Sequence, residues 1–314
     1  MAAATSGSST LSSGSARKKP PRPGQPPDAD PPACYGKLLA MARKVGHVTT
    51  ASALLTAYDQ QMRTAPPNPP AGVRYEQDGP LLRIVGQHRG FISAPRDVGV
   101  RGTELDRLIT RQRDYFAQRG EGVEWKTRGH DEPADLPSRL RAAGFVPEAQ
   151  ETVLIGLTAQ MAASPVVPEG VALRAVTADA DMRRIAEMES AVWGQDWGWL
   201  ADDLTGRIAA TPDDIAVLAA EADGDVVSAA WLVFRPGTDF ASLWGGSTLP
   251  RWRGRGIYRA LVAARAQRAA ARGVRYLQVD ASDDSAPILH RLSFHAVTTT
   301  TPYVWTPPQP GTPG

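Results

Sequence analysis

The chain has 314 residues, of which 42% are hydrophobic and 22% are charged, so it can bury the core of one large or two medium-sized domains. Its net charge of +2 argues against a general nucleic-acid-binding or membrane-surface protein. The single cysteine, Cys34, excludes an intramolecular disulfide framework and a cysteine-based metal site, so we expect no metal. The sequence also lacks a run of about 18 apolar residues, which a membrane-spanning helix would need.

Both ends of the chain have low-complexity sequence. Residues 1–33 are rich in Ser and Gly and then in Pro, and we expect them, like residues 307–314, to be disordered. The basic cluster Arg17-Lys-Lys19 leaves an interaction tail open as an alternative to a solvated extension, which is favoured. The first 15 residues lack the apolar segment of a secretory signal, so we expect a cytoplasmic protein.

A first folded unit is expected over residues 34–160, where helical and strand periodicities alternate. The four prolines between Pro66 and Pro70 end its first helix. The expected elements are a helix over 35–63, strands over 73–77 and 81–86, a helix over 103–119, a strand over 123–126, a helix over 136–143 and a closing strand over 151–157.

A second, complete unit is expected over residues 168–306. Its expected elements are a strand over 171–176, helices over 179–192 and 200–209, a hairpin of 215–222 with 226–236 around Asp223-Gly224, a strand over 241–249, a helix over 257–272, a strand over 274–279, a helix over 286–292 and a strand over 297–305. On the helix over 257–272, Arg265, Arg268 and Arg272 share a face, which predicts an amphipathic surface helix.

A glycine turn joins the strand over 241–249 to the helix over 257–272, with the sequence Arg251-Trp-Arg-Gly-Arg-Gly256. A strand, a glycine turn and a helix N-terminus together present several backbone N–H groups to one anion, and glycines let a phosphate approach the backbone. No Lys-Ser/Thr pair follows, so this is not a nucleotide-binding P-loop. Alternatively, the segment is a plain basic turn or an Arg/Gly segment for nucleic acid, although the net charge makes the latter weak.

The spacing Arg251-x-x-Gly254-x-Gly256 resembles the Q/R-x-x-G-x-G/A signature of the GNAT superfamily of acyl-CoA-dependent N-acetyltransferases. The order of elements over 168–306 is also similar to the complete GNAT fold. Residues 286–294 resemble that family's A-x-x-L-Y-x-x-x-G-F motif with one intervening residue fewer, with His290 in place of Tyr and Ser293 in place of Gly. The resemblance implies an α/β (α+β) fold with a mixed central sheet flanked by helices.

The first unit weakly repeats the end of the second. If Gly120 is aligned with Gly273, Val98, Arg101 and Thr103 fall at the positions of Arg251, Gly254 and Gly256. We therefore expect two tandem GNAT-like units, of which the first is degenerate and lacks the phosphate cradle. An unrelated α/β domain in the first unit remains an alternative.

The resemblance implies acetyl-CoA as co-substrate and direct transfer of its acetyl group to a primary amine. The pantetheine arm would follow the strand over 243–248, where Gly245 and Gly246 predict either a bulge that lets two strands splay apart or a packing bulge without function. The residues expected at acetyl-CoA are Gly246, Thr248, Leu249, Arg251, Trp252, Arg253, Gly254, Arg255, Gly256 and Ile257.

Proton handling departs from the family's pattern, because residues 241–249 contain no Glu and His290 replaces the Tyr. The candidates are His290 as the acid for the departing thiolate and Asp280 as the base; a surface role for His290 and a water chain as base stay open.

The acceptor pocket is expected at Trp193, Asp196 and Trp197, where aromatic rings and a carboxylate suit a cationic amine of a small molecule or a protein. Core tryptophans and a capping aspartate are the alternative. The alternative function is a catalytically idle acyl-CoA-binding or scaffold module. We expect neither nucleic acid nor membrane as partner, and the oligomeric state stays open.

Overall fold

The computed structural model describes residues 50–65, 69 and 72–308. The predicted disorder of residues 1–33, most of the tail over 307–314 and the first part of the helix over 35–63 lie outside these residues. The end of that helix is present as α2 (Ala51–Met62), whose first turn is capped by the Thr50 hydroxyl.

The first half of the described chain contains the predicted helices and strands together with three short elements that were not predicted, β3, β5 and α5. After α2 the order is β1 (Arg74–Asp78), β2 (Leu81–Val85), β3 (Gly90–Ser93), α3 (Gly102–Gln118), β4 (Val123–Arg128), α4 (Leu136–Ala142), β5 (Val146–Pro147), β6 (Glu151–Leu157) and α5 (Thr158–Met161).

In the second half, the predicted order of elements is confirmed. It runs β7 (Ala172–Val176), α6 (Asp179–Trp193), α7 (Trp199–Ala210), β8 (Ile215–Ala222), β9 (Asp225–Phe234), β10 (Phe240–Thr248), the 3₁₀ turn η1 (Pro250–Trp252), α8 (Ile257–Ala271), β11 (Tyr276–Ala281), α9 (Ala286–Arg291) and β12 (His295–Trp305). The hairpin turn between β8 and β9 forms at Asp223 and Gly224, both with positive φ.

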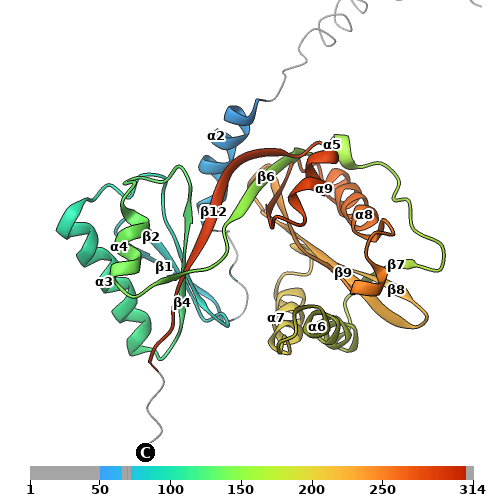
Figure 1. Cartoon of the computed structure of the whole chain (residues 1–314), viewed down its shortest axis with the longest axis horizontal. Coiled ribbons are helices and arrows are strands. Elements are labelled where there is room, and N and C mark those ends of the chain that lie inside the picture. The colour runs from blue at the N-terminus through green and yellow to red at the C-terminus, as the bar shows by residue number, and fades with distance from the viewer. Residues whose placement is uncertain (1–49, 66–68, 70–71, 309–314) are drawn as a thin grey trace, which may run out of the picture. The chain divides into compact units, whose positions relative to one another are not determined.

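The strands of both halves form one mixed sheet in the described part of the chain, with the order β1-β2-β3-β4-β12-β6-β11-β10-β9-β8-β7. Each half places a strand beside strands of the other. β6, from the first half, lies between β11 and β12 of the second half and is antiparallel to both. The long strand β12 pairs with β6 over its first part and with β4 over its second part, Thr300–Trp305 (Figure 1). The boundary expected after residue 160 therefore divides the sequence into two segments, but the strands on its two sides belong to the same sheet.

Helices cover both faces of the second half of the sheet (Figure 1). α8 and α9 pack on one face through Val262, Ala266 and Leu289, against Ala241 and Leu243 of β10. α6 and α7 pack on the other face, where Ile185 and Leu204 meet the side chains of β8 and β9. α3 and α4 form a separate core with the first half, centred on Trp125.

Helix α2 lies where the two halves meet. Its Leu54 and Tyr58 are buried against strands of both halves, namely against Val153 and Ile155 of β6, Phe240 of β10 and Tyr276 of β11. Its C-terminal end is tied to the second half, because Gln61 Oε1 accepts a hydrogen bond from the Asp239 amide at 2.7 Å.

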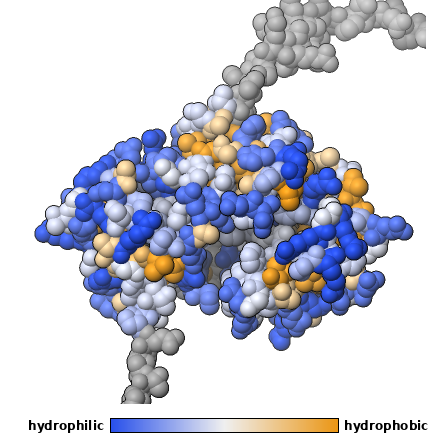
Figure 2. All heavy atoms as spheres, in the orientation of Figure 1, coloured by the Kyte–Doolittle hydropathy of each residue, from blue (hydrophilic) through white to orange (hydrophobic). Residues whose placement is uncertain are grey.

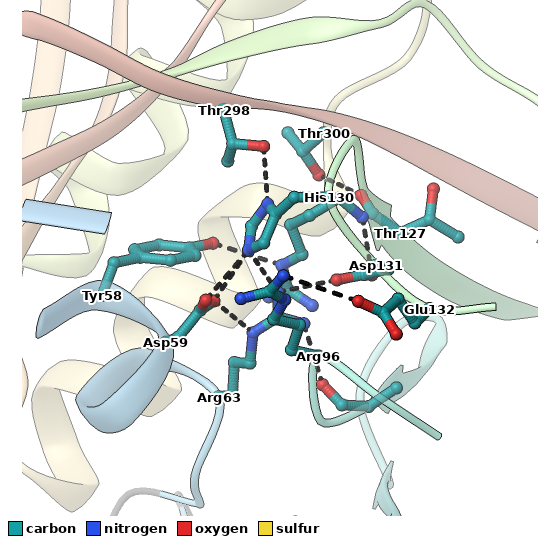
Figure 3. A network of polar contacts seen from close by, with 12 residues as sticks. Tyr58, Asp59, Arg63, Arg96, Thr127, His130, Asp131, Glu132, Thr298 and Thr300 are labelled. Carbon is teal, nitrogen blue, oxygen red and sulfur yellow. Dashed lines mark hydrogen bonds and ion pairs between the residues drawn. The ribbon is translucent and has the colours of Figure 1, made fainter. Parts of the chain in front are cut away.

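A polar network around His130 fixes α2 to the first half and to β12 (Figure 3). The imidazole Nε2 lies 3.0 Å from Asp59 Oδ2 of α2, and Nδ1 lies 2.7 Å from the Thr298 hydroxyl of β12. Arg63 donates to Asp59 and to Asp131, each at 2.7 Å, and it is buried. Because three segments far apart in the sequence share these contacts, the network holds the junction together.

Candidate active site

The glycine turn between β10 and α8 presents an anion-binding surface. Gly254 and Gly256 have φ values of +74° and +93°, which L side chains rarely adopt. In the described residues, no backbone or side-chain acceptor takes a hydrogen bond from the amides of residues 254–259, at the N-terminus of α8. A Cβ placed on Gly254 would meet nothing within 4 Å. The turn therefore has free donors, open space and the positive end of a helix dipole in one place.

Three arginines surround this turn in different ways. Arg253 folds back, so that its Nε donates to the Thr248 carbonyl at 3.0 Å. The Arg255 guanidinium lies 4.5 Å from the centre of the Trp252 ring. Arg251 is exposed and lies 3.8 Å from Asp225, a weak surface ion pair. Their common effect is a positive potential around the free amides.

The predicted bulge in β10 is confirmed, and it lies where β10 and β11 separate. The pairing of β10 with β9 shifts register between Gly245 and Ser247. The parallel pairing of β10 with β11 extends only from Phe240 to Ser242. A Cβ on Gly246 would lie 2.6 Å from the Tyr258 ring, so close packing also requires glycine here. Past Ser242, the strands leave backbone groups available beside the glycine turn.

Arg265 contradicts its prediction, since the sequence analysis places it on an exposed helical face and it is only 1% exposed. Its Nη1 donates to the carbonyls of Trp231 and Trp244, at 3.3 and 3.0 Å, next to the bulge. Burial lowers the pKa of Arg265 to about 10, and Tyr258 opposes this change. The arginine is buried because it supplies donors to carbonyls of β9 and β10 beside the bulge, where the regular ladder is interrupted.

Replacing Arg265 with methionine is expected to lower the free energy of unfolding by about 2–4 kcal/mol, because two buried carbonyls lose their donor. Arg268→Met provides the matched control one turn later, since Arg268 is only half-buried and donates to a carbonyl of its own helix. We expect urea unfolding to show a change under about 1 kcal/mol for that control. An equal loss of unfolding free energy in the two variants would show that the hydrogen bonds from Arg265 to the carbonyls beside the bulge do not stabilise the fold.

His290 and Asp280, the predicted acid and base, lie on different elements, α9 and β11. His290 is exposed, and its Nδ1 lies 3.2 Å from the Phe294 carbonyl, so Nδ1 carries the proton and Nε2 is the free nitrogen. Asp280 accepts from Lys126 Nζ at 2.9 Å and from Gln278 Nε2 at 2.7 Å. Both carboxylate oxygens of Asp280 thus already have donors.

Asp280 belongs to a row of polar side chains that starts where β10 and β11 separate. The Ser242 hydroxyl donates to Gln278 at 2.9 Å, Gln278 donates to Asp280, and Asp280 pairs with Lys126 of β4. Burial alone lowers the pKa of Lys126, but the carboxylates of Asp280 and Glu124 outweigh it and raise that pKa above its ordinary value. Lys126 comes from the first half, so both halves contribute to this row. Figure 2 shows the surface hollowed below the crossing of β6 and β12.

Ser293, which stands where the family's motif has glycine, has a φ of +67°. This left-handed conformation is unfavourable for a residue with a Cβ by about 1–2 kcal/mol. We therefore expect Ser293→Gly to raise the free energy of unfolding by about 0.5–1 kcal/mol, after the higher entropy of unfolded glycine is included. Ser285→Gly is the control, because Ser285 has a φ of −89° and gains nothing from glycine. If denaturant titration gave the same increase in the free energy of unfolding for both variants, the strain argument would be contradicted.

The predicted acceptor residues form a row of aromatic rings between α6 and α7. The ring centres of Trp193 and Trp197 are 6.3 Å apart, those of Trp197 and Trp199 are 5.4 Å apart, and His88 of the first half stacks on Trp199 at 4.7 Å. Trp193 is 58% exposed and is therefore available to a ligand. Asp196 accepts a hydrogen bond from the Gly198 amide at 2.8 Å, so it stabilises the turn before α7; it does not cap that helix, as the alternative interpretation expected, because the N-cap residue is Gly198.

Sequence reasoning missed Glu189, a buried acid on α6. Its carboxylate accepts from the Trp193 indole at 2.9 Å, and that indole also lies 3.3 Å from the Ser247 hydroxyl beside the bulge. A signal was present in the sequence: Glu189 falls at helical spacing from Met182, Ile185 and Ala186, on the apolar stripe of α6. A charged residue on an otherwise apolar helical stripe is predicted to be buried, where it needs a hydrogen-bond partner.

Within the described residues, no group of three or more His, Cys, Asp or Glu side chains is arranged to hold a metal ion. Every helix in these ranges is too short or too polar to span a bilayer.

Comparison with known proteins agrees with this geometry. Residues 181–294 match the model of the Acetyltransferase (GNAT) family. No curated protein matches the chain. A GCN5-related N-acetyltransferase from Kribbella flavida is similar in structure, with a TM-score of 0.56, 19% identity, and coverage of 83% of this chain and 95% of that one.

Two further solved structures are similar at comparable levels. A tandem GNAT protein from the clavulanic acid biosynthesis pathway has a TM-score of 0.54, 14% identity and coverage of 83% and 96% of the two chains. A GCN5-related N-acetyltransferase from Sphaerobacter thermophilus has a TM-score of 0.54, 19% identity and coverage of 82% and 92%. At these identities the structures establish the fold, and the family model covers the glycine turn, the bulge and α9. Residues 181–294 are therefore similar to the acetyltransferase (GNAT) family, and the chain shares the fold of these solved structures.

Proposed function

We propose that the chain transfers an acetyl group from acetyl-CoA to a primary amine by direct attack of the amine on the thioester. The observation that carries this proposal is the combination of free amides at the N-terminus of α8 with the adjacent separation of β10 and β11. A pyrophosphate fits the first feature, and an extended pantetheine arm fits the second, because it can hydrogen-bond to backbone groups that have no neighbouring strand.

The pyrophosphate would lie at Gly254, Arg255 and Gly256, with the flanking arginines supplying positive potential. A backbone N–H at the bulge would polarise the thioester oxygen, as fixed dipoles do in other acyl-transfer sites. The thiolate is a good leaving group, since thiols have a pKa of about 8.5, and a weak acid suffices to protonate it. His290 remains our candidate for that acid in its imidazolium form, in which Nδ1 donates to the Phe294 carbonyl and Nε2 carries the proton that is given to the thiolate.

The acceptor is proposed to be a cationic amine that reaches the thioester from the face covered by α6 and α7. Trp193 and Trp244 offer exposed aromatic surface there, with 58% and 50% of each residue exposed. Aromatic faces attract an ammonium group and allow its neutral form to approach. The Trp197 ring stacks on the Trp193 ring, and Asp196 stabilises the turn after Trp193 through its hydrogen bond with the Gly198 amide.

We further propose that the first half is a degenerate GNAT-like unit that does not bind the cofactor. In the alignment of Gly120 with Gly273, the start of α3 corresponds to the glycine turn of the second half. There, Arg101 pairs with Asp97 at 2.8 Å and lies 4.0 Å from Glu132, and Glu104 sits in the first turn. Carboxylates at this helix N-terminus take the place of an anion and repel phosphate.

Calorimetric titration with acetyl-CoA, followed by a screen of amines for CoA release, tests the proposed function. We expect binding at one site per chain and CoA release above the rate of hydrolysis with at least one amine. Binding without release, across the whole panel, would favour an idle acyl-CoA-binding module instead.

A further inference from the structure

Glu189 is a buried carboxyl group whose charge no cation balances. The residue is 2% exposed, and its Oε1 has no hydrogen-bond partner among the described residues. Its Oε2 accepts from the Trp193 indole at 2.9 Å. No arginine, lysine or histidine of the described chain lies within ion-pairing distance of it.

The elements packed against Glu189 supply only neutral partners. Burial raises the pKa of Glu189, and the nearby Ser247 hydroxyl of β10 and Trp193 indole of α6 oppose this only in part. The indole nitrogen links the other two groups, since it lies 2.9 Å from Glu189 Oε2 and 3.3 Å from the Ser247 hydroxyl. No charged group on β9, β10 or α7 contributes to the shift. A buried unpaired carboxylate destabilises a fold, so its presence points to a use at this position.

The carboxyl group faces the part of the site where a base is missing. Ser247, its neighbour, is the first residue of β10 after the register shift, and it is partly exposed. β10 itself carries no acid between Ala241 and Thr248. Asp280, the other carboxylate near the splay, is neutralised by Lys126 at 2.9 Å. Among these groups, Glu189 alone combines proximity to the bulge with an unsatisfied acceptor oxygen.

We propose that Glu189 receives the proton that the acceptor amine loses, with the Ser247 hydroxyl as the relay between them; this inference rests on the proposed function. The ammonium form of the acceptor gives one proton to the Ser247 oxygen while the Ser247 proton passes to the Glu189 carboxylate. The neutral nitrogen then forms the C–N bond as the C–S bond breaks. His290 gives a proton to the thiolate, and the second nitrogen proton replaces the one that His290 has given. Glu189 returns its proton to water after the product leaves, so the net reaction releases one proton.

Glu189 is in this scheme a positioning and proton-accepting group that acts through Ser247. It also orients Trp193, since the indole N–H is shared between the Glu189 carboxylate and the Ser247 hydroxyl. The exposed aromatic surface and the proton acceptor are therefore coupled by the same hydrogen bonds. An ammonium group placed against Trp193 would lie next to the relay that accepts its proton.

The test compares Glu189→Gln with Glu187→Gln, a matched variant two residues earlier on α6 where the side chain is exposed. Acetyl-CoA affinity is measured by calorimetry, and CoA release is measured from pH 5 to pH 9 with spermidine, tyramine and a lysine peptide as probes. We expect Glu189→Gln to bind acetyl-CoA normally but to lower kcat by about 10²–10⁴-fold. Glu187→Gln should match the wild type.

The pH profile separates a proton acceptor from a structural residue. A base works as the carboxylate, so the wild-type rate should rise as the pH passes through the raised pKa of Glu189, above the ordinary glutamate value of about 4.3. Glu189→Gln should lose this limb and keep the limb that belongs to the amine. Ser247→Ala should lower kcat in the same direction while acetyl-CoA affinity stays constant. If the rate of Glu189→Gln still rises with pH over the range in which the wild-type Glu189 loses its proton, the proposal is overturned.

Thermal unfolding provides a readout that does not depend on activity. Because the pKa of Glu189 is higher in the folded state, its burial penalty appears as the pH rises from the unfolded pKa through the folded one. Glu189→Gln should therefore melt at a higher temperature than the wild type at pH 8 and not at pH 4. A lower melting temperature at pH 8 would assign Glu189 a structural role and overturn the proposal. A wild type that releases no CoA with any probe would instead refute the proposed function itself.

Discussion

Replacing Gly254 with glutamate is expected to lower the affinity for acetyl-CoA by at least about 100-fold, or about 2.7 kcal/mol of binding free energy. The new side chain would start from a position where a Cβ meets nothing within 4 Å, so the fold can accept it. Its carboxylate would then stand among the free amides of the α8 N-terminus, in the space that the pyrophosphate needs. Calorimetric titration with acetyl-CoA measures the effect directly.

Gly237→Glu is a closely matched control for this variant. Gly237 lies in the turn between β9 and β10 with a φ of +78°, close to the +74° of Gly254, and a Cβ there also meets nothing within 4 Å. Both variants should lose about 1–2 kcal/mol of stability through backbone strain, and only Gly254→Glu should lose binding. Equal binding by the two proteins would place the pyrophosphate elsewhere.

Production of residues 165–314 without the rest of the chain is expected to give a polypeptide that does not unfold cooperatively. This segment lacks β6, which pairs with both β11 and β12. The side chains of Val153, Leu154 and Ile155 on β6 are completely buried. At about 1.5–3 kcal/mol each, their burial alone is comparable with the stability of a typical domain, about 5–15 kcal/mol.

Co-production of both segments, cut between Ser164 and Pro165, provides the control. The cut falls between α5 and β7, outside any helix or strand, so the two polypeptides should associate and bind acetyl-CoA as the intact chain does. Circular dichroism during thermal unfolding distinguishes the cases. A sharp transition of residues 165–314 on their own would mean that β6 is dispensable.

The order of helices and strands was predictable because it depends on local patterns. α6 shows helical spacing of Met182, Ile185 and Ala186, and the hairpin turn at Asp223-Gly224 has its own sequence signal. β3 was missed because its four residues begin with a glycine and are too few to show alternation. The exchange of β6 and β12 was also missed. A strand such as β6 has the same apolar sequence whichever half it pairs with, since pairing partners are set by contacts distant in sequence.

The candidate site was predictable where glycine restricts the backbone and not where burial decides. The turn at Gly254 and Gly256 and the bulge at Gly245 and Gly246 require positive φ, which few other residues adopt. Arg265 was misplaced because arginines repeated on a helix are usually exposed; its position four residues after Leu261 put it on the buried face. Whether the first half descends from the same family, and which residues handle protons, stay predictions.

The position of β12 has a consequence for synthesis of the chain. β12 is the last strand of the described residues, yet it lies between β4 and β6 in the interior of the sheet. While the ribosome makes the intervening sequence, at about 5–20 residues per second, β4 keeps an open edge for roughly 10–35 s. Open edges recruit other chains, so the nascent protein passes through a period of exposure to aggregation before its fold can close. Rapid expression at high protein concentration should therefore leave a larger fraction of this chain aggregated than the stability of the folded protein suggests.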